Sequence, residues 1–235
     1  MRNRKKLLIF ATMLPWPGDA DEYGFDAGKD AFVSENYATA VAIWREQASA
    51  GDADTQLAMG LVYRRGVGVP KTPAKTVKWP GLAAAQELPQ AQSVLGRMFE
   101  IGYGVTPDDK KALDLYRRAA EQGEAIAQWR LGNLYAATQR MKSHLKLATH
   151  WWRKAARRGY SRAQFELASA YYDGRGVSRG LARAAYYYEA AARQRLAVAL
   201  LYIAVMYGDS LGVPRNEVQA AAWFRKAADQ GHVAA

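Results

Sequence analysis

The sequence predicts an all-α fold, a right-handed α-solenoid built from helix-turn-helix repeats. A junction residue recurs every 36 positions, and each intervening segment contains two runs of apolar residues at helical spacing, separated by a loop that usually contains glycine. A fixed period of this size is typical of stacked supersecondary units rather than of one globular core. The junction position is occupied in turn by Gly51, Glu87, Gly123, Gly159, Arg195 and Gly231.

The segment 87–122 illustrates one repeat. Apolar residues at positions i, i+4, i+7 and i+8 predict a first helix over 89–101. The glycines of a Gly-Tyr-Gly-Val loop end this helix, because glycine readily adopts the positive φ that a helix C-terminus needs. Asp108 and Asp109 begin a second helix over 110–122, since acidic residues are favoured at the positive end of a helix. Each repeat is therefore a helical hairpin.

Two positions of the first helix keep their character in every repeat. One holds a small residue, where we expect two helices to approach closely: Gly60, Gly96, Gly132, Ala168 and Ala204. An aromatic residue follows three positions later: Tyr63, Phe99, Tyr135, Tyr171 and Tyr207. The second helix carries bulky residues followed by an Ala-Ala pair. We interpret the repeated aromatic residues as core packing between hairpins, with a ligand cage as the alternative.

Three repeats depart from this pattern. In the first repeat Pro80 falls inside the second helix, where an internal proline costs about 3 kcal/mol and is expected to kink or break the helix. The third repeat has residues 138–141 in place of the double-glycine loop, and the fifth keeps only the second glycine, Gly212. We interpret the first departure as drift in a tolerant array, with a functional hinge at Pro80 as the alternative.

These residues resemble the Sel-one-like repeat, a relative of the tetratricopeptide repeat with a longer loop. The resemblance spans 51–230 as five repeats, and the runs that carry it are 125–135, 151–159 and the Gly-x-Gly-Val loops at 66–69, 102–105 and 174–177. It implies a scaffold or adaptor for protein partners, often in bacterial envelopes or signalling assemblies. Members that bind cell-wall or β-lactam ligands tend to carry one disulfide per repeat, whereas this chain has no cysteine.

The ends of the chain carry different signals. Residues 1–20 combine a basic start, a short apolar run and small residues at Gly18 and Ala20, which is typical of a secretory signal peptide. The apolar run is too short to span a membrane. Residues 21–50 contain a shorter-looped hairpin that is expected to cap the stack, and residues 231–235 form a C-terminal tail. A periplasmic or secreted protein is predicted, with a cytoplasmic one as the alternative.

The composition limits the kinds of partner. The formal net charge is +11, which favours acidic partners such as an anionic protein, lipid headgroups, a cell-wall polymer or nucleic acid. No motif of a known nucleic-acid-binding fold is present, so no specific nucleic acid is predicted. We expect a monomer, or an end-to-end dimer formed through the last hairpin.

No catalytic, cofactor or metal site is predicted. The three histidines, His144, His150 and His232, lack the spacing of metal ligands, because two of them lie six residues apart on one expected helix and the third is remote. No Gly-x-Ser-x-Gly motif supports a nucleophilic serine. The sequence therefore predicts a protein that is not an enzyme and uses no cofactor.

The first helices of successive hairpins are expected to line the concave face of the solenoid. Positions on this face that differ between repeats are free to contact a partner. The predicted partner-binding residues combine aromatic anchors, a charge and an amide: Arg97, Trp129, Asn133, Phe165, Ser169 and Tyr172. The alternative is that Trp129 and Phe165 pack in the core between hairpins.

Together these observations predict a non-catalytic scaffold or adaptor of the bacterial envelope that binds a protein or peptide on the concave face of the solenoid. One alternative is recognition of an anionic cell-wall or lipid ligand, and another is a cytoplasmic signalling scaffold if residues 1–20 are not cleaved. The location of the positive charge discriminates between them. A concentrated basic groove would favour a polyanion, whereas charge scattered beside an aromatic stripe would favour a peptide.

Overall fold

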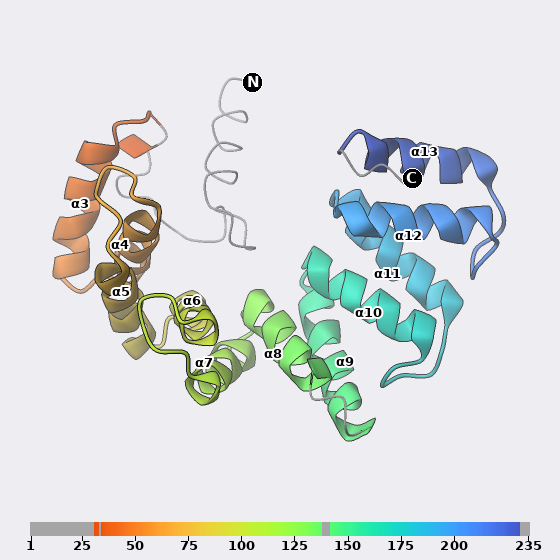
Figure 1. The fold of residues 1–235 in the computed structure, drawn as a ribbon, viewed down its shortest axis with the longest axis horizontal. Helices are drawn as coiled ribbons and strands as arrows, with labels where there is room; N and C mark the ends of the chain where they lie inside the picture. Colours follow the sequence, from red (N-terminus) through yellow and green to blue (C-terminus); the bar gives the residue numbers. More distant parts are fainter. Residues whose placement is uncertain (1–30, 33, 138–141, 231–235) are drawn as a thin grey trace. The chain divides into compact units, whose positions relative to one another are not determined.

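The computed structural model describes residues 31–32, 34–137 and 142–230. Across these ranges every element of regular secondary structure is an α-helix (Figure 1), which confirms the predicted all-α repeat fold. The predicted signal peptide, the atypical loop of the third repeat and the C-terminal tail lie outside the described residues. The backbone divides into two compact units, Met1–Ile126 and Ala127–Ala235.

In the N-terminal unit each helix packs against the next along the chain. Its described helices are α3 (Tyr37–Ser49), α4 (Ala53–Arg65), α5 (Pro73–Ala85), α6 (Pro89–Ile101) and α7 (Asp109–Glu121). Of the predicted capping hairpin at 21–50, the structure describes residues 31–32 and 34–50, which include α3. Trp44 of α3 is buried, and its ring and that of Tyr37 contact Phe32 at centroid distances of 5.4 and 5.0 Å. Trp44 also shares one buried core cluster with Leu57 of α4, and α3 therefore packs against the first helix of the first hairpin.

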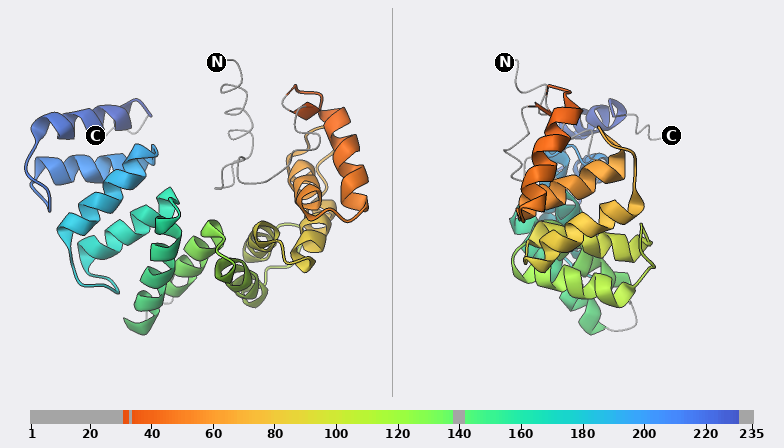
Figure 2. Two further views of the ribbon diagram at one scale, coloured as in Figure 1. Left: turned by 180° about the vertical axis from the view of Figure 1, so that it is seen from behind. Right: turned by 90° about the vertical axis from the view of Figure 1, so that its left-hand side faces the viewer.

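The C-terminal unit repeats the same arrangement (Figure 2). Its helices are α8 (Ala125–Ala137), whose first two residues fall in the N-terminal unit, α9 (Lys142–Arg157), α10 (Ser161–Asp173), α11 (Leu181–Arg193), α12 (Ala197–Gly208) and α13 (Glu217–Ala228). The first helix of a hairpin is therefore α4, α6, α8, α10 or α12, and the second is α5, α7, α9, α11 or α13.

The predicted helix ends form as expected. Asp108 caps α7, because its carboxylate accepts a hydrogen bond from the Lys111 backbone N–H at 3.0 Å. Gly102 ends α6 in the left-handed conformation at φ 69°. Together these two ends confirm that the loop of this repeat joins two helices.

The second loop glycine has a separate role that spacing alone does not reveal. A Cβ at Gly176 would lie 2.2 Å from the carbonyl oxygen of Leu145, and one at Gly212 would lie 2.2 Å from the backbone of Leu181. Both contacts are with the second helix of the preceding hairpin. The fifth repeat therefore keeps this glycine, while Ser210 adopts the left-handed conformation that the missing first glycine would supply, at φ 58°.

Where the small residue of the first helix is Gly96 or Gly132, it faces an aromatic ring on the second helix, at the position where a close approach of the helices is predicted. A Cβ at Gly96 would lie 3.1 Å from the ring of Tyr116, and one at Gly132 would lie 2.5 Å from the ring of Trp152. Tyr116 and Trp152 are both buried. The two helices of a hairpin thus approach closely because glycine leaves room for an aromatic ring.

The break predicted at Pro80 is wrong, because α5 continues through this residue. Pro80 occupies the repeat position of Tyr116 and Trp152, and it is buried. A Cβ at Gly60 would lie 2.3 Å from the proline ring, so the ring fills the place of the aromatic side chain. Packing of the ring against α4 outweighs the local preference of proline, as tertiary context commonly does.

A glutamine pair joins the two helices in three of the hairpins. The amide of the second-helix glutamine donates to the side-chain oxygen of the first-helix glutamine: Gln86 to Gln56 at 2.9 Å, Gln122 to Gln92 at 3.1 Å and Gln194 to Gln164 at 2.9 Å. Gln86 and Gln194 also donate to the carbonyl of the junction glycine, at 2.9 and 2.7 Å. The pair therefore fixes the junction end of each of these hairpins.

The helix contact can be tested with two glycines. Replacing Gly132 with alanine should lower the free energy of unfolding by about 1–3 kcal/mol, because the methyl group would overlap the Trp152 ring. Gly81 lies inside α5 with open space where a Cβ would point. Gly81→Ala should raise the free energy of unfolding by about 0.5–1 kcal/mol, since alanine favours a helix over glycine. Urea denaturation measures both, and equal effects would contradict the packing assignment.

Candidate functional site

The six predicted partner-binding residues divide between the two units. Arg97 lies on α6 of the N-terminal unit, and the other five lie on α8 and α10 of the C-terminal unit. Trp129 is only 6% exposed, and its ring contacts Tyr160 at a centroid distance of 5.6 Å. The guanidinium groups of Arg130 and Arg162 lie 4.5 and 5.5 Å from the same ring. Trp129 therefore presents little surface to a partner.

The polar members of the predicted set hold their own hairpins together. The Asn133 side-chain oxygen accepts a hydrogen bond from the Trp152 indole at 2.9 Å. The hydroxyls of Ser169 and Tyr188 lie 2.9 Å apart and share a hydrogen bond. In each case the partner is the buried aromatic residue that faces the small residue of the first helix. These two polar groups therefore satisfy the polar atoms of buried aromatic residues within the chain.

Arg97 has a comparable internal role. Its guanidinium lies 2.8 Å from the Glu100 carboxylate, and Glu100 accepts a hydrogen bond from the Tyr116 hydroxyl at 2.5 Å. The pair is half-buried. Arg97 thus pairs with the carboxylate that accepts a hydrogen bond from the Tyr116 hydroxyl in the same hairpin.

Phe165 belongs to an aromatic cluster that we define as Phe165, Tyr188 and Tyr202. The Phe165 ring lies 5.5 Å from each tyrosine ring, and the two tyrosine rings stack at 4.9 Å. Tyr188 is buried, whereas Tyr202 is 44% exposed. Burial raises the pKa of the Tyr188 hydroxyl above its usual value, against the opposing effect of its Ser169 hydrogen bond. Tyr172, the last of the six, is half-buried, and its carbonyl accepts from Arg179 at 3.1 Å.

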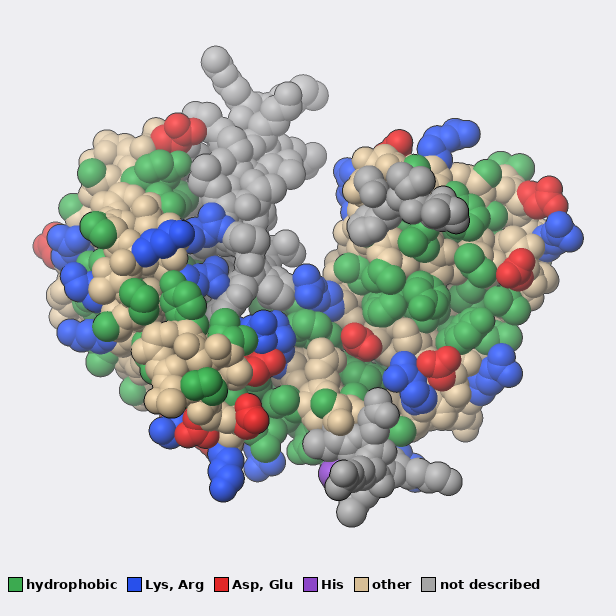
Figure 3. Space-filling view, viewed as in Figure 1, with side chains coloured by type: hydrophobic (Ala, Val, Ile, Leu, Met, Phe, Trp, Pro, Cys, Tyr) green, Lys and Arg blue, Asp and Glu red, His purple; other side chains and the backbone are tan. Residues whose placement is uncertain are grey.

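Tyr202 extends the cluster along α12. Val198, Tyr202 and Val205 lie at i, i+4 and i+7 on this helix and are 38%, 44% and 43% exposed. We call these three residues the α12 stripe. Figure 3 shows hydrophobic side chains gathered over α10 and α12 of the C-terminal unit. An apolar stripe on the first helix of a hairpin is a surface that can bind an apolar face of a partner.

The prediction from sequence missed Val198 and Tyr202. The position of Tyr202 is held in the preceding repeats by Ala58, Val94, Arg130 and Glu166, so it varies as strongly as the positions that were chosen. Comparing the repeats one position further along the first helix would therefore have identified it.

Glu166 lies beside the aromatic cluster in the sequence and is half-buried on α10. Burial raises the pKa of its carboxyl, and the positive charge of Arg175 offsets this effect in part. Among the described residues, no group of three or more His, Cys, Asp or Glu side chains could hold a metal ion. The described helices also include none that is long and apolar enough to cross a membrane.

These features define a class of protein, an all-α helical repeat protein with an exposed apolar stripe on one of its first helices. The family described as Sel1 repeat matches this chain at residues 53–88, 89–124, 125–160, 161–196 and 197–232. The chain therefore belongs to the Sel1 repeat family, as its sequence motifs predicted. Sel1 repeats are generally protein-interaction modules on a non-catalytic scaffold.

Solved structures show the same fold. A Sel1 repeat protein from Oxalobacter formigenes is 29% identical, with a TM-score of 0.77 over 87% of this chain and 82% of that one. The protective antigen c5321 of uropathogenic Escherichia coli, which has an SLR fold, is also 29% identical, with a TM-score of 0.74 over 91% of this chain. This chain spans about half of c5321, 48% of its length. The immunity protein Pa5087 of Pseudomonas aeruginosa, 21% identical with a TM-score of 0.57, shares the fold. No match was found among curated proteins.

The hydrogen bond between Ser169 and Tyr188 can be tested by a double-mutant cycle. Ser169→Ala and Tyr188→Phe should each lower the free energy of unfolding by about 1 kcal/mol. Each substitution removes one hydroxyl of the pair and leaves the other hydroxyl without its hydrogen-bond partner. The double variant should lose less than the sum of the two. Ser178→Ala, in an exposed loop, serves as the control. Additive losses in urea denaturation would show that the two hydroxyls act independently.

The raised pKa of Glu166 gives a dependence of stability on pH. Below the usual glutamate pKa of about 4.3 the carboxyl is protonated in both the folded and unfolded chain, so burial carries no penalty. As pH rises through the raised pKa of the folded state, the buried carboxylate destabilises the fold. Glu166→Gln should therefore stabilise the protein at pH 7 and have little effect at pH 4. The exposed Glu217→Gln is the control, and a Glu166→Gln effect independent of pH would contradict the assignment.

Proposed function

We propose that this chain is a non-catalytic scaffold or adaptor that binds a protein partner through the α12 stripe and the aromatic cluster. The observation that carries the proposal is the exposed apolar surface of Val198, Tyr202 and Val205 on a first helix. The Tyr202 ring packs against Phe165 and Tyr188 on one side and is exposed to solvent on the other. A ring held in this way is a rigid anchor for a partner.

The hydrogen bonds inside the hairpins support the same proposal. Asn133 and Ser169 form hydrogen bonds with the buried residues Trp152 and Tyr188. These polar side chains of the predicted surface are therefore already used within the chain. Apolar contact is left as the principal means of binding on α10 and α12. An apolar helix face binds most effectively to another apolar face, such as that of an amphipathic helix or an extended segment with alternating anchors.

We also propose that the protein acts in the bacterial envelope. This proposal rests on residues 1–20, whose basic, apolar and small-residue segments are those of a signal peptide. The alternative of an anionic cell-wall or lipid ligand is favoured by the charge of +11. It is disfavoured by the apolar character of the α12 stripe, which offers no charge to a polyanion.

The α12 stripe can be tested by affinity capture of the tagged native chain from its own cells. A partner should be retained by Tyr186→Ala, which removes a 68% exposed tyrosine on α11, and lost from Tyr202→Ala combined with Val205→Ala. Burial of such anchors makes about 2 kcal/mol or more of binding energy sensitive to truncation. N-terminal sequencing of the captured chain should give a start at Asp21. Equal retention by both variants would contradict the proposed surface, and an intact Met1 would contradict export.

A further inference from the structure

The positive charge of the chain is concentrated in one unit. Residues 1–126 contain 16 Lys and Arg and 16 Asp and Glu, and therefore have no net charge. Residues 127–235 contain 17 Lys and Arg but only 6 Asp and Glu, a net charge of +11. The α12 stripe and the aromatic cluster lie in this second unit. Charge complementarity therefore favours an acidic partner at this surface.

The second hairpin shows how a charged junction is neutralised within the chain. Its junction residue is Glu87, in the left-handed conformation at φ 63°. The Glu87 carboxylate forms an ion pair with Arg118 near the end of α7. It also accepts a hydrogen bond from the Gln92 amide at 2.8 Å, and Gln92 in turn accepts from Gln122 at 3.1 Å. Acid, base and two amides thus form one connected group.

The fifth hairpin has two cations where the second has an ion pair. Arg195 stands at the position of Glu87, with φ 64°, and Lys226 stands at the position of Arg118. Leu200 replaces Gln92, so that Gln230, at the position of Gln122, has no glutamine to which it can donate. Neither Arg195 nor Lys226 forms an ion pair with a carboxylate in the described part of the chain. Among the described residues, no ion pair in the fifth hairpin therefore corresponds to that of Glu87 and Arg118.

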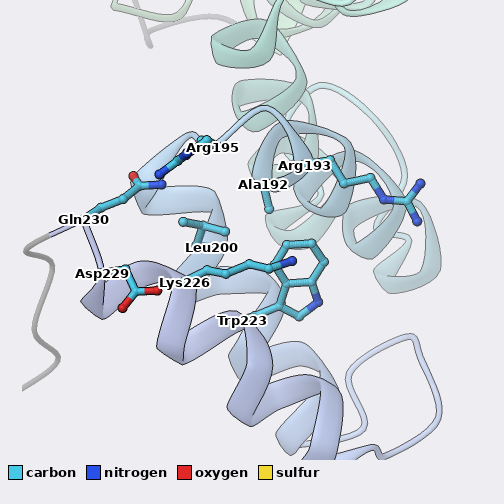
Figure 4. A pocket seen from close by; sticks show the side chains of 8 residues that line it. All are labelled: Ala192, Arg193, Arg195, Leu200, Trp223, Lys226, Asp229 and Gln230. Carbon is cyan, nitrogen blue, oxygen red and sulfur yellow. The ribbon is translucent and has the colours of Figure 1, made fainter. Parts of the chain in front are cut away.

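A pocket of about 350 Å³ lies at this position (Figure 4). Eight residues line it: Ala192, Arg193, Arg195, Leu200, Trp223, Lys226, Asp229 and Gln230. The Lys226 ammonium lies 4.1 Å from the centroid of the Trp223 ring, which holds it over an apolar wall. Arg193 is paired with Glu189 at 2.7 Å. Arg195 and Lys226 therefore remain as the cations available to a ligand.

We infer that this pocket binds a carboxylate side chain of an acidic segment of a protein partner, whose apolar residues contact the α12 stripe. The carboxylate would accept from the Arg195 guanidinium and the Lys226 ammonium, as Glu87 accepts from Arg118 in the second hairpin. Arg195 precedes α12 by two residues and Val198 lies in the first turn of that helix. One short acidic and apolar segment can therefore engage both the pocket and the stripe. This inference rests on the proposed function.

The same residues disfavour a nucleic acid or another polyphosphate. Asp229 also lines the pocket, so the two available cations face one carboxylate of the chain, and the remaining charge suits one monovalent group rather than a run of phosphates. The surface that continues from the pocket along α12 consists of Val198, Tyr202 and Val205 rather than of further cations. A polyanion would need a continuous basic track, which this helix does not supply.

The inference can be tested by panning a random 16-residue peptide display library on the full chain. Three proteins are compared: the wild type, Arg195→Glu and the control Lys110→Glu. The control makes the same change of charge at an exposed residue of α7 in the N-terminal unit. Arg195→Glu should fold, because Glu87 occupies the equivalent position with the same backbone conformation and a basic partner. Its thermal midpoint should equal or exceed that of the wild type.

Peptides selected by the wild type and by Lys110→Glu should be enriched in Asp and Glu next to aromatic or aliphatic residues. A selected acidic peptide should bind Arg195→Glu about tenfold more weakly in fluorescence anisotropy, because the introduced acid pairs with Lys226 and repels the peptide. Its affinity for the wild type should fall with added salt.

Two other outcomes separate the inference from the proposed function. Selected peptides that are apolar without acidic enrichment, or an acidic enrichment unchanged in Arg195→Glu, would overturn the carboxylate pocket and leave the scaffold function standing. No enriched peptide from any of the three proteins, together with binding of a 16-nucleotide DNA or of phosphatidylglycerol vesicles, would overturn both.

Discussion

The close approach of the two helices in each hairpin is the contact on which the rest of this structure depends. A small residue on the first helix leaves room for a bulky side chain on the second, as Gly132 does for the Trp152 ring. Once the ring is buried, its polar atom needs a partner, and Asn133 or Ser169 supplies one from the same first helix. The contact therefore fixes both the hairpin geometry and which polar side chains are engaged within it. Even Pro80 conforms, because what the position requires is a ring-sized volume against Gly60.

The helices and their order could be predicted because they follow from local signals that recur every 36 residues. Periodic apolar residues, the Asp108 cap and the left-handed Gly102 each act within one or two turns. The uninterrupted α5 could not be predicted, because the effect of Pro80 depends on its packing against Gly60, twenty positions earlier. The exposed surface was also only partly predictable. Adjacent residues of a helix point about 100° apart, so a choice that is wrong by one position selects a different face. The choice of Trp129 rather than its neighbour Arg130 on α8 therefore selected a buried side chain.

A repeat fold allows one position to take different roles without altering the backbone. The junction residue has positive φ in every hairpin described, and glycine, glutamate and arginine all occupy it. Glycine lets the paired glutamine donate to the junction carbonyl, as Gln194 does to Gly159. Glu87 forms an ion pair within its hairpin, and Arg195 borders a pocket. The backbone conformation is common to all three, so the side chain is free to change with the partner that the hairpin meets.

The two units together show that the positive charge is not a requirement of the fold. Both are built from the same hairpins, yet residues 1–126 carry no net charge and residues 127–235 carry +11. Self-repulsion among unpaired cations destabilises a compact chain, and a neutral unit of the same architecture avoids that cost. At the fifth hairpin the difference is local, because Arg195 and Lys226 stand where the second hairpin has an acid-base pair. The fold accepts an ion pair or two cations at this position, so the fold itself does not require the cations. Their place beside an apolar helix supports the proposed attraction of an acidic, apolar segment of another protein.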